Sequence, residues 1–259
     1  MTSTTRQRQQ SILAQAYERG HVSVKDLAEQ MAVSVATIRR DLRALADEGQ
    51  LELTYGGAFP ARNSDYSFRS KAARNVEAKR VIGRLAGEMV ADGEQVFVDS
   101  GTTAMEIAPY LRRRRGLTVI VNSVRIAEEL EAPGLNVILL GGQYRPDRMD
   151  TVGPVATAAL EQLRGYMAFI GADGLGMDFG LTASDIESAH LFRLAVRNSR
   201  EAILLADRSK FVAPSLYRIV EWGAISRVVT DVEPARPWCE FFRERGIDVM
   251  FPDAEAAGQ

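Results

Sequence analysis

The sequence predicts an α/β protein in which a small helical head precedes a larger body with a mainly parallel β-sheet. In the head, residues 5–50 contain three short segments with apolar residues at helical spacing. In the body, from residue 95 onward, short apolar runs alternate with helical patterns. That alternation is typical of a parallel sheet covered by helices on both faces.

Length and composition exclude several classes of protein. The chain has 259 residues, of which 46% are hydrophobic and 25% charged, so one or two folded domains are expected rather than a disordered chain. One cysteine cannot form an internal disulfide and two histidines cannot support a His/Cys zinc cluster, so no metal site is expected. The polar N-terminus and the lack of a long apolar run predict a cytoplasmic protein without a membrane partner.

The head begins with a helix predicted over residues 6–18. A second helix begins after Ser23, which is expected to cap it because Asp26 follows three residues later. A third helix is predicted over residues 35–48, with Ser34 as its N-cap. Two short helices joined by a tight turn are typical of the helix-turn-helix motif.

A strand is predicted directly after the third helix. Residues 51–55 alternate as a half-buried strand does, and Gly56 and Gly57 close the unit. The strand pair between Gly49 and Gly57 would form the wing of a winged helix-turn-helix. The head is therefore assigned to residues 1–58.

The head has a local basic patch although it is neutral overall. Residues 1–58 contain seven Lys or Arg and seven Asp or Glu residues. Arg39, Arg40 and Arg43 nevertheless cluster on the third helix. Because the formal net charge of the whole chain is −2, nucleic-acid binding would have to depend on such a patch.

The connection and the body follow the head. Residues 58–68 lack any periodic pattern and are predicted to be a linker, followed by a helix over 69–90, so that 59–75 hold the linker and the start of a connecting helix. The body is assigned to 76–252 and a C-terminal tail to 253–259. Strands are predicted at 95–99, 117–122, 136–141, 167–172, 202–207, 227–231 and 248–251, and helices at 102–111, 124–130, 154–163, 185–199 and 234–244.

Several predicted strands of the body end in small polar residues. Ligands of parallel α/β sheets bind beyond the carboxyl ends of the strands, so these ends would form one polar rim. The first run enters a helix through Ser100 and Thr102, which could offer backbone amides and hydroxyls to a phosphate or could simply cap the helix. Lys210 could supply a cation to the phosphate or lie in solvent. A rim of this kind suits a hydroxylated, phosphorylated small molecule.

Two groups of arginines have competing interpretations. Arg145 and Arg148 lie in a polar loop, residues 143–151, that could cover the rim or could be an exposed loop. The run from Arg112 to Arg115 is interpreted as a helix C-terminus, where cations complement the helix dipole, in preference to a contact with phosphate or DNA.

The chain resembles the DeoR family of bacterial sugar-metabolism repressors over about residues 6–252. In the head, the resemblance is carried by RQQSIL at 8–13, VSVKDLA at 22–28, VSVATIRRDL at 33–42 and YGGA at 55–58. In the body, it is carried by DSGTT at 99–103, NS at 122–123, LGG at 140–142, VGP at 152–154, IGADG at 170–174, GLT at 180–182 and ADRSKF at 206–211. The four-arginine run and the loop 144–150 lie outside this pattern.

The resemblance implies a winged helix-turn-helix joined to a sensor domain similar in fold to ribose-5-phosphate isomerases and CoA transferases. It implies a repressor that binds double-stranded operator DNA, is released by a phosphorylated sugar and needs no cofactor. Symmetric operators imply in turn a homo-oligomer, either a dimer or a tetramer. The residues expected at the DNA are Ser23, Ser34, Ala36, Thr37, Arg39, Arg40, Arg43, Tyr55, Gly56 and Gly57. The residues expected at the effector are Asp99, Ser100, Gly101, Thr102, Thr103, Asn122, Ser123, Gly141, Gly142, Arg145, Asp173, Thr182, Asp207 and Lys210.

Two other functions compete with this one. A sugar-phosphate isomerase or a CoA-transferase-like enzyme would use the body alone, but both chemistries need a positioned carboxylate. No glutamate lies between residues 142 and 160, and no glycine-rich lysine segment follows Asp207, so no catalytic residue is expected and the protein is not expected to be an enzyme. A protein-interaction adaptor is disfavoured by the arginine cluster on the third helix.

Overall fold

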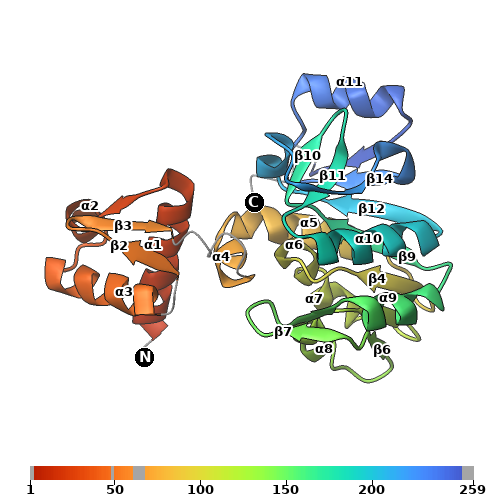
Figure 1. Ribbon diagram of the computed structural model, residues 1–259, viewed down its shortest axis with the longest axis horizontal. Helices are drawn as coiled ribbons and strands as arrows, with labels where there is room; N and C mark the ends of the chain where they lie inside the picture. Colours follow the sequence, from red (N-terminus) through yellow and green to blue (C-terminus); the bar gives the residue numbers. More distant parts are fainter. Residues whose placement is uncertain (1–2, 48–49, 61–67, 253–259) are drawn as a thin grey trace. The chain divides into compact units, whose positions relative to one another are not determined.

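The computed structural model describes residues 3–47, 50–60 and 68–252 (Figure 1). The chain forms two compact units, Met1–Val76 and Glu77–Gln259, here called unit 1 and unit 2. Each unit has its own hydrophobic core, and each is described by itself.

Unit 1 is a helical domain with a small antiparallel sheet in the order β1-β3-β2. Its elements are α1 (Ser3–Arg19), β1 (Val22–Ser23), α2 (Val24–Gln30), α3 (Val35–Asp47), β2 (Leu51–Leu53), β3 (Gly57–Pro60) and α4 (Phe68–Ala73). The helix-turn-helix α2–α3 and the wing β2–β3 are confirmed. One prediction was wrong: β3 takes up residues 58–60 of the expected linker, because Ala58 and Phe59 pair with β2. The helix α4 lies in the segment where the connecting helix was expected to start, and it packs on α1. The rest of the expected linker, residues 61–67, lies outside the described residues.

The core of unit 1 fixes the orientation of α3. Ile38, Leu42 and Leu45 of α3 are buried among apolar side chains of α1 and α2. Asp41 shares this buried face and accepts a hydrogen bond from Arg8 Nε of α1 at 2.6 Å. The burial of this face leaves the opposite face of α3 in solvent.

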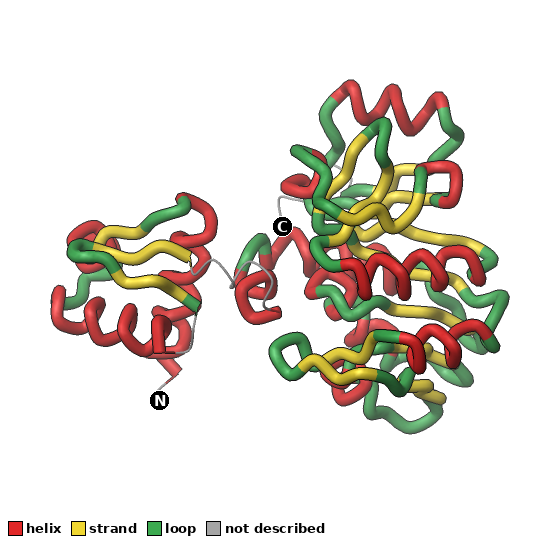
Figure 2. Tube along the Cα trace, in the orientation of Figure 1, coloured by secondary structure: helices red, strands yellow, loops and turns green. Residues whose placement is uncertain are grey.

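Unit 2 is built on a seven-stranded sheet in the order β15-β14-β12-β9-β4-β5-β6. Figure 2 shows the strands of the protein in yellow and its helices in red. All neighbouring strands are parallel, which confirms the predicted sheet. The strands are β4 (Gln95–Val98), β5 (Thr118–Val121), β6 (Asn136–Leu139), β9 (Met167–Gly171), β12 (Glu201–Leu205), β14 (Arg227–Val229) and β15 (Asp248–Met250).

Alternate residues of these strands enter two separate cores. On β4, Phe97 belongs to one cluster, whereas Val96 and Val98 belong to the other. Helices cover both faces, which explains why the strands are almost continuously apolar. The helices are α5 (Val76–Glu88), α6 (Thr102–Met105), α7 (Ala108–Leu111), α8 (Val124–Glu129), α9 (Pro154–Glu161), α10 (Ile186–Asn198) and α11 (Arg236–Glu244), and short 3₁₀ turns are η2 (Arg208–Phe211) and η3 (Trp222–Ala224).

Two helices predicted as continuous are broken. The helix expected over 69–90 divides at Asn75, whose φ of 50° is left-handed and cannot continue a helix. The helix expected over 102–111 divides into α6 and α7 because Pro109 has no backbone N–H to continue the hydrogen-bond ladder.

Five strands of unit 2 were not predicted. β7 (Gln143–Arg145) and β8 (Asp150–Val152) form a hairpin in the expected polar loop. β10 (Gly174–Gly176), β11 (Gly180–Ala183) and β13 (Tyr217–Val220) form a second antiparallel sheet. Two glycines of this sheet lie where a Cβ would meet backbone: Gly174, at 2.1 Å from Ala213 O, and Gly180, at 2.2 Å from Val220 O.

Candidate functional site

The exposed face of α3 carries three arginines. Arg39, Arg40 and Arg43 are all exposed, and within the residues that the structure describes none of them forms an ion pair. Their guanidinium groups are therefore available to a partner that carries negative charge. This is the arrangement by which a recognition helix contacts DNA phosphates and base edges.

The N-terminus of α3 is capped as predicted. Ser34 Oγ accepts a hydrogen bond from the Thr37 backbone N–H at 3.1 Å and lies 2.9 Å from Thr37 Oγ1. Ser23 accepts from the Asp26 N–H at 3.5 Å and caps α2 in the same way. Ala36 is exposed on the first turn of α3, so none of the described residues of unit 1 covers its side chain.

Of the three wing residues expected at the DNA, two are open to solvent and one is needed for packing. Tyr55 is completely exposed, and a Cβ on Gly56 would meet open space. Gly57 has a structural role, because a Cβ there would lie 1.9 Å from Val22 O, where β1 pairs with β3. The close approach of these strands therefore explains the second glycine.

The expected rim of unit 2 lies at one edge of the sheet. Polar residues follow β4, β5, β6, β9 and β12, which are neighbours in the sheet and run in one direction. Asp99, directly after β4, is buried and accepts hydrogen bonds from the backbone N–H of Gly101, at 2.6 Å, and of Gly171. It therefore joins the ends of β4 and β9. Thr102 and Thr103 follow as buried side chains in the first turn of α6.

The end of β5 contributes a buried amide and a buried hydroxyl. Asn122 Nδ2 donates to Thr151 O at 3.0 Å, while its buried Oδ1 has no hydrogen-bond partner in the described structure. Ser123 Oγ accepts from the Ile126 N–H at 3.3 Å and caps α8. Ser100 donates to Asp150 Oδ2 at 3.0 Å, which connects the loop after β4 to the β7–β8 hairpin.

The two glycines after β6 differ in their surroundings. Gly141 is exposed, and a Cβ there would have no atom within 4 Å. A Cβ on Gly142 would lie 2.6 Å from Val152 O, so packing against β8 requires the second glycine. The open backbone beside Gly141 leaves room for a ligand at this strand end.

Arg145 is fully engaged inside unit 2. Its Nε and one terminal nitrogen bind the two oxygens of Asp150, at 2.7 and 2.6 Å, and the other terminal nitrogen binds Asp185 at 2.8 Å. Arg148 also binds Asp185, at 2.6 Å. Burial opposes the charge of Arg145, but the neighbouring carboxylates outweigh it and raise its pKa above the ordinary value. Arg145 therefore holds the hairpin to α10 rather than offering a free cation.

Asp185 is the centre of this ionic network. Its side chain caps α10 by accepting from the Ser188 N–H at 2.9 Å. Burial alone would raise the pKa of Asp185, but the Ser188 amide, Arg148 and Arg145 outweigh it and lower the pKa to about 2. The carboxylate is therefore ionised at all ordinary pH values.

The remaining rim residues differ in how far their polar groups are already bound within the protein. Thr182 Oγ1 donates to Gly174 O at 2.6 Å and accepts from the Ser215 N–H at 2.7 Å, so its hydroxyl is used within the protein. Asp173 accepts from the Ser184 N–H at 2.7 Å, and Asp207 caps η2. Lys210 is half-buried and has no ion-pair partner in the described part of the chain. It is thus the cation of the expected rim that remains available.

Two carboxylates were missed as site residues. Asp150, in strand β8 of the hairpin, is only 1% exposed and accepts hydrogen bonds from Ser100 and Arg145. Asp185 could have been found, because an aspartate three residues before Ser188 at the start of an apolar helical pattern is a capping signal. Asp150 has no comparable signal, since its role depends on a hairpin that the sequence pattern did not predict.

Neither a metal centre nor a membrane span is found in the described structure. Over residues 3–47, 50–60 and 68–252, no group of three or more His, Cys, Asp or Glu side chains could hold a metal ion. Within the same residues, no helix combines the length and the apolar character needed to cross a bilayer.

Comparison with known protein families gives matches in both units. Residues 8–62 match the DeoR-like helix-turn-helix domain, and residues 74–232 match the DeoR C-terminal sensor domain. Similar proteins include the HTH-type transcriptional regulator GlpR of Haloferax volcanii, 35% identical over 81% of this chain and 83% of its own length. The transcriptional repressor AccR of Agrobacterium fabrum is 32% identical over 88% of this chain and 90% of its own. The glycerol-3-phosphate regulon repressor of Escherichia coli is 29% identical over 88% of this chain and 91% of its own length.

Solved structures with some likeness include the ribose 5-phosphate isomerase of Methanocaldococcus jannaschii, with 21% identity, a TM-score of 0.39 and coverage of 53% of this chain and 55% of that chain. The chain belongs to the DeoR family of helix-turn-helix transcriptional regulators, with the helix-turn-helix domain in its N-terminal part and the sensor domain in its C-terminal part.

Proposed function

We propose that the protein represses a carbohydrate-utilisation operon by binding its operator through α3 and the wing. The observation that carries the proposal is that Arg39, Arg40 and Arg43 of α3 are exposed and that no carboxylate of the described residues pairs with them. N-terminal residues of a recognition helix reach base edges, so Ser34, Ala36, Thr37 and Arg40 face the bases, while Arg39 and Arg43 bind phosphates. Relatives named as repressors of the aga operon and of the glycerol-3-phosphate regulon support the carbohydrate assignment.

The effector of unit 2 is, on this proposal, a phosphorylated sugar bound at the rim. The ammonium of Lys210, which has no ion-pair partner in the described part of the chain, suits the phosphate. The open backbone at Gly141 and the unpartnered Oδ1 of Asn122 suit the sugar and its hydroxyls. Arg145 supports the site indirectly, because it fixes the hairpin through Asp150, and Asp150 in turn holds Ser100.

Arg40→Ala tests the DNA interface. A side chain that contacts a base edge contributes about 1–3 kcal/mol of discrimination, so we expect a loss of roughly tenfold or more in affinity for the operator. Electrophoretic mobility shift on the DNA upstream of the protein's own gene measures this, with a scrambled duplex as control. Equal affinity of the wild type for the upstream DNA and the scrambled duplex would contradict the proposal.

Release by effector tests the rim. A panel of phosphorylated sugars is added to the protein–operator complex, and one compound is expected to release it. Lys210→Ala should raise the concentration needed for release, while operator affinity without effector stays unchanged. Arg208→Ala is the matched control, because Arg208 belongs to the same turn but is already paired with Asp231. Equal release of the Lys210→Ala and wild-type complexes would show that the phosphate binds elsewhere.

Two further parts of the proposal concern assembly and catalysis. One helix-turn-helix buries little DNA surface, and symmetric operators present paired half-sites, so the active form is a dimer or a tetramer. Light scattering of the operator complex measures this order. The protein is a regulator without turnover, so incubation with ribose 5-phosphate or an acyl-CoA should leave both compounds unchanged.

A further inference from the structure

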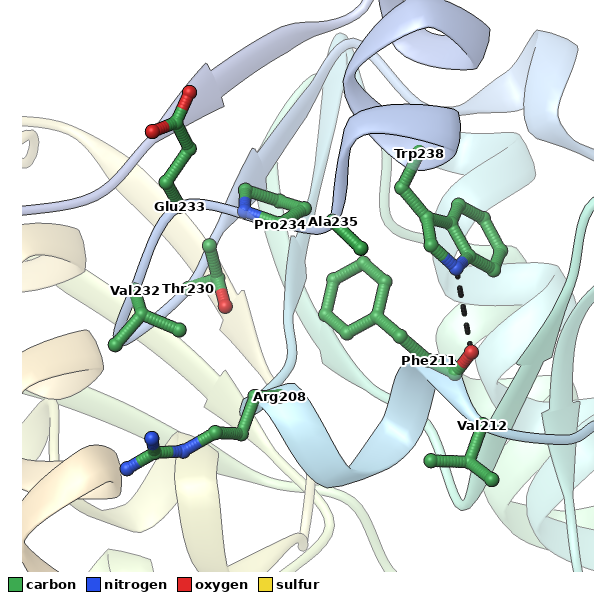
Figure 3. Close-up of a pocket in the computed structure, with 9 residues that line it drawn as sticks. All are labelled: Arg208, Phe211, Val212, Thr230, Val232, Glu233, Pro234, Ala235 and Trp238. Atoms are coloured by element: carbon green, nitrogen blue, oxygen red, sulfur yellow. Dashed lines mark hydrogen bonds between the residues drawn. The ribbon is translucent and has the colours of Figure 1, made fainter.

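A pocket lies beyond the carboxyl ends of β12 and β14, next to the part of the effector rim at the end of β12 (Figure 3). Its volume is about 270 Å³, near the lower end of the range for small-molecule sites, roughly 300 Å³ upward. Residues of η2 line it on one side, and the loop from β14 into α11 lines it on the other. None of its lining residues is assigned to the DNA interface or to the effector rim.

Two aromatic rings form the apolar part of the pocket. Phe211 and Trp238 meet edge to face, with their ring centres 5.2 Å apart and their planes at 84°. The Trp238 indole N–H donates to the Phe211 carbonyl at 3.3 Å, which fixes both residues (Figure 3). Val212 and Pro234 add aliphatic surface. A preformed aromatic and aliphatic lining favours a planar, largely apolar ligand.

Thr230 supplies an unsatisfied polar group in this apolar lining. It is 1% exposed, and its Oγ1 has no hydrogen-bond partner in the described structure. Buried hydroxyl groups are almost always hydrogen-bonded, so an unpartnered one that lines a cavity indicates a ligand group that completes it. The ligand therefore carries a hydroxyl, amide or comparable substituent on its ring.

The charges around the pocket disfavour an anion. The guanidinium of Arg208 is paired with Asp231, Nε to Oδ2 at 3.2 Å. Glu233 adds an exposed carboxylate at the opposite wall. Arg208, the cation among the lining residues, is therefore already paired, so the pocket offers a phosphorylated compound no unpaired cation of its own.

We propose that this pocket is a second small-molecule site, which takes an uncharged planar ring bearing one hydrogen-bonding group. The site is separate from the sugar-phosphate rim and does not depend on the identity of the effector bound there. Its ligand lies against η2, the turn that also carries Lys210.

The direct test uses the full-length protein and 4-fluorophenol, whose ring and single hydroxyl match the proposed chemistry. Fluorine NMR measures binding, and the tryptophan indole N–H signals report its place, since the chain has only 2 tryptophans. We expect saturable binding that shifts the Trp238 indole signal and that excess ribose 5-phosphate does not displace. The absence of saturable binding, or displacement by the sugar phosphate, would overturn the proposal of a separate site.

Two variants assign the contacts within the pocket. Thr230→Val removes the hydroxyl at nearly constant volume, so 4-fluorophenol should bind roughly three- to tenfold more weakly while fluorobenzene binds as before. Ala235→Phe places a ring in the pocket and should abolish the binding of both probes. Ala224→Phe is its matched control, an exposed alanine outside the pocket. Because Ala235 is also exposed, its variant should fold even if Thr230→Val does not. Wild-type affinity of Ala235→Phe for both probes would contradict the assignment.

Discussion

Arginines in the two units have opposite surroundings. On α3 of unit 1, Arg39, Arg40 and Arg43 are exposed, and no carboxylate within the described residues pairs with them. In unit 2, Arg145 and Arg148 are less than one-fifth exposed and share the carboxylates of Asp150 and Asp185. The sequence predicts that the α3 arginines contact DNA, that Arg145 contacts the effector, and that the loop of Arg145 and Arg148 covers the rim or is exposed. The ion pairs in the structure distinguish the two groups.

The difference shows what determines the role of an arginine. A guanidinium that binds one buried and one partly buried carboxylate has its charge and its hydrogen bonds satisfied within the fold, so it stabilises the protein. A guanidinium in solvent without a partner contributes little to stability but is available for DNA. Removal of the first kind should therefore affect unfolding, and removal of the second kind should affect binding.

Arg145→Ala is expected to have the largest effect. It leaves Asp150, only 1% exposed, without its bidentate partner, and breaking a buried ion pair in this way lowers stability by about 3–5 kcal/mol. Denaturant unfolding followed by tryptophan fluorescence measures unit 2 specifically, because Trp222 and Trp238 both lie there. Arg112→Ala, at an exposed position, is the control and should change stability by less than about 0.5 kcal/mol. Equal effects of the two variants would contradict a structural role for Arg145.

Asp185→Asn should show a smaller, pH-dependent effect. The pKa of Asp185 is lowered from 3.8 to about 2, so its ionised form stabilises the folded state by about 2 kcal/mol above pH 4. This contribution falls as the pH drops through the folded pKa. Asparagine retains the helix cap, so the stability gap between wild type and variant should be present at pH 7 and shrink between about pH 4 and pH 2. A gap that stays constant over this range would show that the charge of Asp185 is not responsible.

The α3 arginines should have the smallest effect on folding. The triple variant Arg39→Ala, Arg40→Ala and Arg43→Ala removes exposed charges without known partners, so the stability of unit 1 should change by less than about 0.5 kcal/mol. Thermal unfolding followed by circular dichroism measures it. A loss of several kcal/mol would mean that these arginines support the fold, as Arg145 does.

Much of the fold follows from local patterns in the sequence. The seven parallel strands were predicted because they are short apolar runs that alternate with helical patterns, and the caps at Ser23 and Ser34 were predicted from spacing. The sheet of β10, β11 and β13 was missed because Gly174 and Gly180 resemble turn residues. They are glycines because neighbouring backbone leaves no room for a Cβ, which only the tertiary structure shows.

The site was predictable to a lesser degree. The topology confirms that the ends of β4, β5, β6, β9 and β12 share one edge, a consequence of parallel strands. Whether a polar side chain at that edge is free depends on partners far away in the sequence. The sequence predicts both Arg145 and Lys210 as cations of the rim. In the structure Arg145 is paired with Asp185, which lies forty residues further along the chain, whereas Lys210 is not. Spacing along the chain does not reveal such pairs.

The four-arginine run provides the control for the central measurement. The run follows α7, as its interpretation as a helix C-terminus predicts: Arg112 is the C-cap of the helix, and Arg113 lies over the Tyr110 ring. Arg112 and Arg113 are exposed, so they match Arg39 and Arg43 in charge and exposure but lie in unit 2.

The most direct test of the account is the salt dependence of operator affinity in the wild type and in two double variants. Each arginine that neutralises a phosphate contributes about one to the slope of log affinity against log salt. We expect Arg39→Ala with Arg43→Ala to lower the slope by about two for each head bound, and Arg112→Ala with Arg113→Ala to leave it unchanged. An unchanged slope in the first variant, or an equal fall in both, would contradict the assignment of the DNA contacts to α3.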